Sequence, residues 1–320
     1  MFEQILSSVF TTMFLASILR ITAPILFAAL AASVSGKAGV INIGLEGIMM
    51  IAALSGVLFS AWTQSSFLGV LGAATIGMLI GLMMGFFNLK LGTDIILTGI
   101  AINMLGGGGT VFFLFLFTGE KGNSASIPSR MLPTVDIPFL DNIPVLGALS
   151  GQSVLTYVAF LCVVLVFILF YKTPLGLKIR AVGENPHAAD SVGLSVDNIR
   201  YIALGISGFL AGMGGAYMSM FYTRGFNANM VAGRGFIALA AQAMGRGEPL
   251  GVLVSSLFFG VTDALRINME GMGLPSQLVA ALPYVMTIVG LSLYMASTIK
   301  KAKRVKKLTG KPPVKEGETA

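Results

Sequence analysis

Long apolar runs without a single charge constrain this chain more than any other feature. Residues 47–89 contain no Asp, Glu, Lys or Arg, and only the segment 62–66, a tryptophan followed by four polar residues, divides them. A helix needs about 20 apolar residues to cross the hydrocarbon core of a bilayer, so this run is long enough for two crossings. Only 11% of the residues are charged, whereas soluble domains carry about 25%. The composition therefore excludes a soluble enzyme.

The apolar runs are continuous, which indicates membrane-spanning helices and not the alternating strands of a β-barrel. Arg20 interrupts the first run, so that span either begins later or follows an interfacial helix. We expect an all-α, polytopic integral membrane protein with about eight to ten transmembrane helices. Besides the two spans within 47–89, the predicted spans cover residues 12–34, 95–117, 151–171, 200–222, 250–268 and 276–298.

Basic residues in short loops predict which side of the membrane each loop occupies. Eight of the 21 basic residues lie in the tail 300–320, which we place in the cytoplasm together with residues 172–200 and the loops that carry Lys37 and Lys90. The proline-containing connection 118–150 is then the outer loop, and the N-terminus lies outside. Because residues 172–200 and the tail are both placed in the cytoplasm, the chain must cross the membrane an even number of times between them. Only three full-length spans are predicted there. We therefore expect a further crossing near 235–244, as a short buried helix. The chain thus divides into a membrane domain, 1–299, and a disordered tail, 300–320.

The loop 172–200 contains the signals of a very short helix. Asn185 is a good N-cap, Pro186 fits the first turn, and Gly193 is placed to end the helix. Ser195 is expected to cap the next helix. The short helix carries Ala188 and Ala189, which it cannot bury by itself and which suit the groove of a soluble partner. The alternative is an ordinary solvated loop.

Four segments of the chain resemble one family in the same order and spacing. Residues 183–194, GENPHAADSVGL, resemble the cytoplasmic coupling loop of membrane subunits of bacterial ABC importers. Residues 36–50, 90–105 and 232–251 resemble the permease family that serves branched-chain amino acids, ribose-like sugars and nucleosides, and most closely its nucleoside (simple-sugar) branch. The resemblance spans most of the chain and implies a permease domain over 1–299.

This resemblance implies a permease subunit that forms the translocation path for a small polar solute, most closely a nucleoside. A simple sugar such as ribose or a branched-chain amino acid is the alternative solute. The implied partners are an ABC ATPase subunit, a second identical or homologous permease, an extracytoplasmic substrate-binding lipoprotein and membrane lipid, without nucleic acid. The location is a bacterial cell membrane. Contact with the ATPase is expected from Gly183, Glu184, Asn185, Pro186, Ala188, Ala189 and Gly193.

No catalytic chemistry is expected in this chain. It contains no G-x-x-x-x-G-K-[ST] loop, so ATP hydrolysis belongs to a separate subunit. We expect no bound cofactor and no metal, because the only histidine, His187, has no cysteine or carboxylate at ligand spacing. A stand-alone secondary transporter is the alternative of a different class; such proteins often show repeated halves and buried charges for ion coupling.

Polar residues within the predicted spans are candidates for the translocation path or its gate. Asn42 and Glu46 are one helical turn apart and are expected to face the same direction. The alternative for Glu46 is a structural ion pair, for example with Lys37. Asn103 precedes the glycine run 106–109, so it and Gly107 are expected at a bend that lines the path. The alternative is close helix packing. Asp94 is expected only to cap a helix.

Overall fold

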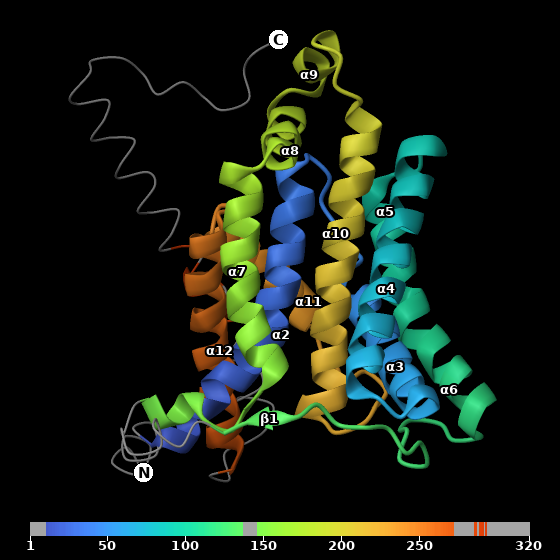
Figure 1. Cartoon of the computed structure of the whole chain (residues 1–320), viewed down its shortest axis with the longest axis vertical. Helices are drawn as coiled ribbons and strands as arrows, with labels where there is room; N and C mark the ends of the chain where they lie inside the picture. The colour runs from blue at the N-terminus through green and yellow to red at the C-terminus, as the bar shows by residue number, and fades with distance from the viewer. Residues whose placement is uncertain (1–10, 137–145, 272–284, 287, 291, 293–320) are drawn as a thin grey trace.

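The computed structural model describes residues 11–136, 146–271 and parts of 285–292. Long helices stand side by side in a bundle (Figure 1). At one end lie two short helices, α8 (Pro174–Glu184) and α9 (Pro186–Ser191). At the other end lies β1 (Thr134–Val135), which pairs with β2 (Gln152–Ser153), next to the short helix η3 (Leu146–Leu149). We call these the α9 end and the β1 end.

Seven helical spans in the described residues are long and apolar enough to cross a membrane. Five begin and end within a few residues of the predicted spans, and the first runs unbroken through Arg20, with no separate interfacial helix in the residues described. The predicted span 276–298 and the tail 300–320 fall largely or wholly outside the described residues. The spans comprise α2 (Thr12–Lys37), α3 (Leu45–Thr63), α4 (Ser66–Gly85) with η1 (Phe86–Lys90), α5 (Ile95–Met104) with η2 (Leu105–Gly109) and α6 (Thr110–Thr118), α7 (Val154–Lys172), α10 (Val196–Tyr217) with η4 (Met218–Tyr222), and α12 (Pro249–Gly271).

The polar residues that divide the apolar runs begin the helices. Ser65 accepts a hydrogen bond from the backbone N–H of Leu68 at 3.5 Å, and Asp94 accepts from Ile96 and Leu97 at 2.8 and 3.0 Å. These side chains satisfy N–H groups that have no partner within the helix. The capping role predicted for Asp94 is therefore confirmed.

Glycines allow α4 and α10 to pack with their backbones in contact at the centre of the bundle. A side chain at Gly77 would overlap the carbonyl of Gly208, and one at Gly81 would overlap the carbonyl of Leu204. In lipid the hydrophobic effect does not drive helices together, so their association depends on van der Waals contact, which small residues allow at short backbone distances. The buried core accordingly lies among α2, α3, α4 and α10.

Residues 38–44 form a non-helical return that enters the bundle from the α9 end. Gly39 lies beside Gly183 at that end, whereas Asn42 donates to Ser207 Oγ at 3.0 Å deeper inside. Helix α3 starts at Leu45, level with Asn103, which is the ninth residue of a 24-residue span. Irregular backbone at this depth is tolerated because protein surrounds it. The first turn of α3 therefore lies inside the membrane-spanning region.

Residues 223–233 form a second return, which enters from the β1 end. Asn227 bridges to Asn123 at that end, and the return leads to α11 (Arg234–Met244), which packs against α2, α12 and α3. Eleven residues make a helix about 16 Å long, half of a membrane span. Gly247, after α11, lies close to Lys37 at the α9 end, since a Cβ on Gly247 would be 3.3 Å from Lys37 Cε. The short buried helix predicted near 235–244 is confirmed, and irregular backbone completes its crossing.

Candidate functional site: a polar groove where two helices begin

A groove of about 630 Å³ lies where the N-termini of α3 and α11 meet beside α5. It lies within the membrane-spanning region, beside the sixth to tenth residues of the 24-residue span 95–118, and combines polar with large apolar side chains. This central groove is lined by Glu46, Ile100, Asn103, Met104, Asn229, Ala232, Gly233 and Phe236. Two of the four predicted path residues, Glu46 and Asn103, belong to it.

Glu46 clamps the start of α3 to the start of α11. Its Oε1 accepts a hydrogen bond from the Gly233 N–H and its Oε2 from the Gly235 N–H, both at 2.7 Å. The N-terminus of a helix favours negative charge, so this geometry stabilises a carboxylate in an apolar region. Lys37, the alternative partner predicted for Glu46, is instead paired with Glu248 at 2.6 Å. The predicted ion pair between Glu46 and Lys37 is wrong, because Lys37 lies at the α9 end whereas Glu46 lies deeper, at the central groove.

Asn103 attaches α5 to the entry of α3. Its Oδ1 accepts from the Gly47 N–H at 2.8 Å, and its Nδ2 donates to the Ile43 carbonyl at 3.0 Å. A Cβ on Gly106 would lie 2.5 Å from the Gly47 Cα. The close-packing alternative thus describes Asn103 and Gly106, although Asn103 still borders the groove. The glycine run does not break the helix; it lies in the π-helical segment η2.

Asn42 and Gly107 lie outside the central groove. Asn42 is fully buried against α10, and it precedes α3, so it does not share a helical face with Glu46 as expected. Gly107 has no atom within 4 Å of the position that a Cβ would take. It therefore lies on an unpacked face of η2, away from the groove.

Two features near the groove escaped the sequence analysis. Asn229 lines the groove with a left-handed backbone, at φ 58°. Arg234, in the first turn of α11, forms a buried ion pair with Asp263 of α12 at 3.1 Å, and Asp263 also accepts from Arg266 at 2.7 Å. A buried charge requires such partners. The available signal was the pair of opposite charges at Arg234 and Asp263, both flanked by apolar residues.

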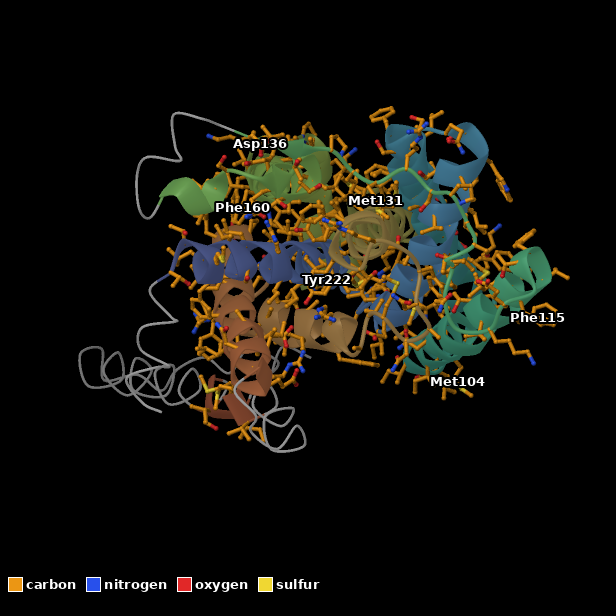
Figure 2. All side chains as sticks on the ribbon, turned by 90° about the horizontal axis from the view of Figure 1, so that it is seen from below. Met104, Phe115, Met131, Asp136, Phe160 and Tyr222 are labelled. Carbon is orange, nitrogen blue, oxygen red and sulfur yellow. The ribbon has the colours of Figure 1, made fainter. Side chains whose placement is uncertain are left out.

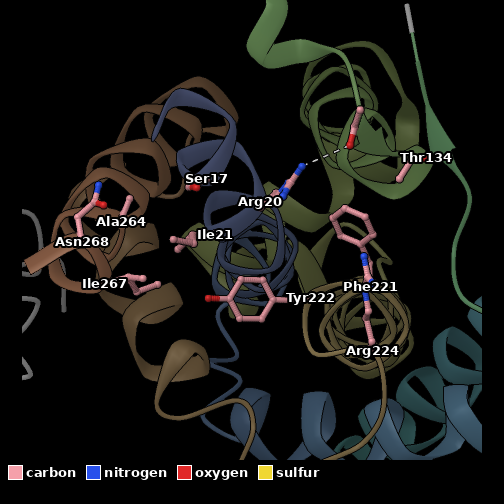
Figure 3. A pocket seen from close by; sticks show the side chains of 11 residues that line it. Ser17, Arg20, Ile21, Thr134, Phe221, Tyr222, Arg224, Ala264, Ile267 and Asn268 are labelled. Carbon is pink, nitrogen blue, oxygen red and sulfur yellow. Dashed lines mark hydrogen bonds between the residues drawn. The ribbon is translucent and has the colours of Figure 1, made fainter. Parts of the chain in front are cut away.

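A second cavity, of about 390 Å³, lies at the β1 end between α2, η4 and α12. Figure 2 shows the molecule from this end, with Tyr222 near the centre of the view. Figure 3 shows Arg20 and Arg224 on one side of the cavity and Asn268 on the other. Arg20 donates to Gln152 Oε1 at 3.2 Å and lies over the Phe221 ring. No carboxylate is among the described residues that line this cavity, so it favours polar groups that accept hydrogen bonds.

The predicted short helix in the loop 172–200 is present as α9. Asn185 Oδ1 accepts from the Ala188 N–H at 3.0 Å, Pro186 is the first helical residue, and Gly193 follows the helix with φ 82°. Ser195 precedes α10, but its side chain makes no capping hydrogen bond. The N-cap and the helix end are therefore as predicted, and the Ser195 cap is not.

The residues expected to contact a partner divide between two environments. Glu184, Asn185 and Ala188 are exposed, whereas Ala189 is buried, 4% exposed. Gly183 packs on α2, where any side chain would overlap the Lys37 carbonyl. The expectation of two free alanines was wrong for Ala189, because its side chain faces the interior.

Among the described residues, no group of three or more His, Cys, Asp or Glu could hold a metal.

Residues 14–291 match the family model described as "Branched-chain amino acid transport system / permease component". The chain is 38% identical to the guanosine ABC transporter permease protein NupQ of Bacillus subtilis, over 84% of this chain and 88% of that protein. It is 33% identical to the nucleoside ABC transporter permease protein NupC of Lactococcus lactis, over 89% and 92%. The glucose ABC transporter permease protein TsgB13 of Haloferax volcanii is 27% identical, over 87% and 75%.

A solved structure, of a metal-chelate type ABC transporter in an inward-facing conformation, has a similar fold. The TM-score is 0.51 at 13% identity, and the match covers 87% of this chain and 84% of that one. At this identity the likeness concerns the fold alone.

Proposed function

The chain belongs to the family of permease components of branched-chain amino acid transport systems and is a membrane permease of an ABC transporter; from this premise we propose that the solute it imports is a nucleoside. The likeness to NupQ and NupC over most of both chains carries the proposal. The central groove is where we place the solute's passage, since it is a polar recess within apolar spans.

The lining of the central groove suits the mixed chemistry of a nucleoside. Phe236 and Met104 offer apolar surface to a flat base, and the amide of Asn229 offers a donor and an acceptor to sugar hydroxyls. Glu46 and Asn103 are already engaged with backbone groups, so they shape the groove more than they bind the solute. We assign Asn229 and Phe236 as the residues that contact the solute.

A simple sugar is the second candidate, favoured by the likeness to the glucose permease TsgB13. A sugar would use the same amide but would gain little from Phe236 and Met104. The two candidates therefore differ in how strongly uptake depends on the apolar lining.

The proposed partners occupy different parts of the molecule. A separate ATPase subunit docks at the α9 end, on the exposed residues of α9, and this end faces the cytoplasm because Lys37, Lys90 and the α8–α9 segment gather there. A substrate-binding lipoprotein delivers solute at the β1 end. A second permease covers the central groove, because a polar recess at this depth is unfavourable against lipid. The complex resides in a bacterial cell membrane.

Uptake of radiolabelled guanosine into proteoliposomes that contain the complete transporter tests the proposal. We expect ATP-dependent uptake that excess unlabelled nucleoside suppresses and excess ribose or leucine does not. Uptake by the permease without an ATPase would contradict the ABC mechanism and favour a secondary transporter. ATP-dependent uptake of glucose without guanosine would replace the nucleoside by a sugar.

A further inference from the structure

One carboxylate joins four elements at the α9 end of the bundle. Glu248, in the turn between α11 and α12, pairs with Lys37 Nζ at the end of α2 at 2.6 Å. Its other oxygen accepts a hydrogen bond from the hydroxyl of Tyr171 at the end of α7. The guanidinium of Arg180, on α8, lies 5.0 Å from the centre of the Tyr171 ring. Glu248 therefore links α2, α7 and α8 to the turn that follows α11.

Helix α11 is held at both of its ends. At its N-terminus the Gly233 and Gly235 N–H groups bind Glu46 at the central groove. At its C-terminal end Ser33 donates to the Gly247 carbonyl, next to Glu248. Because α11 is a single helix about 16 Å long, a displacement of its Glu248 end reaches the groove as a movement of a nearly rigid body.

The same carboxylate is one contact away from the segment proposed to meet the ATPase. Asn185 ends α8 and caps α9, so no flexible linker separates these two helices. Gly183, near the end of α8, packs directly on the Lys37 carbonyl. A displacement of α9 therefore also displaces α8, which contacts both partners of Glu248. It contacts the Lys37 backbone through Gly183 and the Tyr171 ring through Arg180.

We infer that Glu248 is a positioning residue for transport: it connects the coupling segment α8–α9 to α11, and α11 carries the displacement to Glu46 at the central groove. This inference rests on the proposed docking of the ATPase at α9. The pair with Lys37 is too exposed to add much stability, at 25% and 41% side-chain exposure. The carboxylate instead fixes relative position: it binds α2 through Lys37 and α7 through Tyr171, and Arg180 on α8 packs on the Tyr171 ring.

The first test measures solute moved per ATP hydrolysed by the complete transporter in proteoliposomes, with guanosine as the solute. We expect Glu248→Gln to lower this ratio at least fivefold. Glu270→Gln is the matched control, because Glu270 is also a partly exposed partner of a basic residue, Arg266, but lies at the opposite end of α12. Lys37→Gln added to Glu248→Gln should lower the ratio no further, since both act through one contact. An unchanged ratio in Glu248→Gln, or additive losses, would overturn the inference.

The second test does not depend on the identity of the solute. A spin label on Ala243→Cys, an exposed position of α11, is placed in a Cys162→Ser background. Trapping the transporter with ATP should change the spectrum in the parent and not after Glu248→Gln. An equal change in both would show that α11 moves without Glu248. If guanosine is not transported at all, the proposed solute is wrong, and this spectroscopic result still decides the role of Glu248.

Discussion

At the scale of single residues, the structure shows that the intramembrane carboxylate of Glu46 binds backbone N–H groups and holds two segments together. Glu46 has a residue on a return segment as one donor and a helix N-terminus as the other, and both donors are glycine N–H groups. Charge-assisted hydrogen bonds of this kind are worth about 1.5–3 kcal/mol each. The groove keeps its shape because the carboxylate is satisfied by the protein and not by the solute.

Two glycine positions test this reading of the clamp. Gly235→Ala would place a Cβ 2.6 Å from the Glu46 backbone nitrogen, so we expect a lower melting temperature in detergent and loss of uptake. Gly107→Ala is the control, since its Cβ would meet nothing within 4 Å and alanine favours a helix by about 0.5–1 kcal/mol. Equal melting temperatures for the two variants would contradict the close approach of α11 to α3.

The pKa of Glu248 gives a pH-dependent prediction. Burial alone would raise this pKa, but the hydrogen bonds from Lys37 and Tyr171 and the positive charges of Lys37 and Arg180 together hold the pKa below the ordinary value of 4.5. A carboxyl with a lowered pKa contributes stability above its unfolded pKa and loses it as the pH falls through the folded pKa. The melting temperature of the parent should therefore exceed that of Glu248→Gln by a small margin at about pH 7, since the pair is partly exposed. This gap should close below about pH 4. A gap that widens with acid would be inconsistent with these contacts.

At the scale of elements, α9 separates surface from core within two adjacent residues. Ala188 is exposed and Ala189 is buried. We expect Ala188→Glu to lower solute moved per ATP while the amount and melting temperature of the permease stay unchanged. Ala189→Glu should also lower the melting temperature, because it buries a charge without a partner. The comparison is made by thermal unfolding of the purified permease and by transport in proteoliposomes. Full coupling in Ala188→Glu would remove α9 from the ATPase contact.

At the scale of the whole molecule, the gathering of Lys37, Lys90 and α9 at one end predicts sidedness. Ala125 and His187 are exposed positions in the segments at the β1 end and the α9 end. Cysteines placed singly at these positions in a Cys162→Ser background should react with an impermeant thiol reagent from opposite sides. In intact cells we expect Ala125→Cys to label and His187→Cys to label only after lysis. Labelling of both from outside would refute the orientation.

The sequence by itself determined the class of fold, the approximate ends of the described spans and the short helix α9. These follow from local physics: a bilayer requires about 20 apolar residues per helix, and caps such as Asn185 and Asp94 act within a few residues. The parity of the basic loops also predicted that the segment near 235–244 crosses. This prediction did not depend on the length of the segment, which is too short for a full span.

Only the tertiary structure decided which polar residues meet. Glu46 binds N–H groups 187 and 189 residues away, and Lys37 binds a carboxylate 211 residues away. Such partners depend on two non-helical returns, at 38–44 and 223–233, and irregular backbone at this depth is tolerated only where it packs on protein or lines a cavity. No local periodicity encodes that environment. The helix that the sequence implied for Asn42 and Glu46 is therefore absent, and the groove forms where the two returns end.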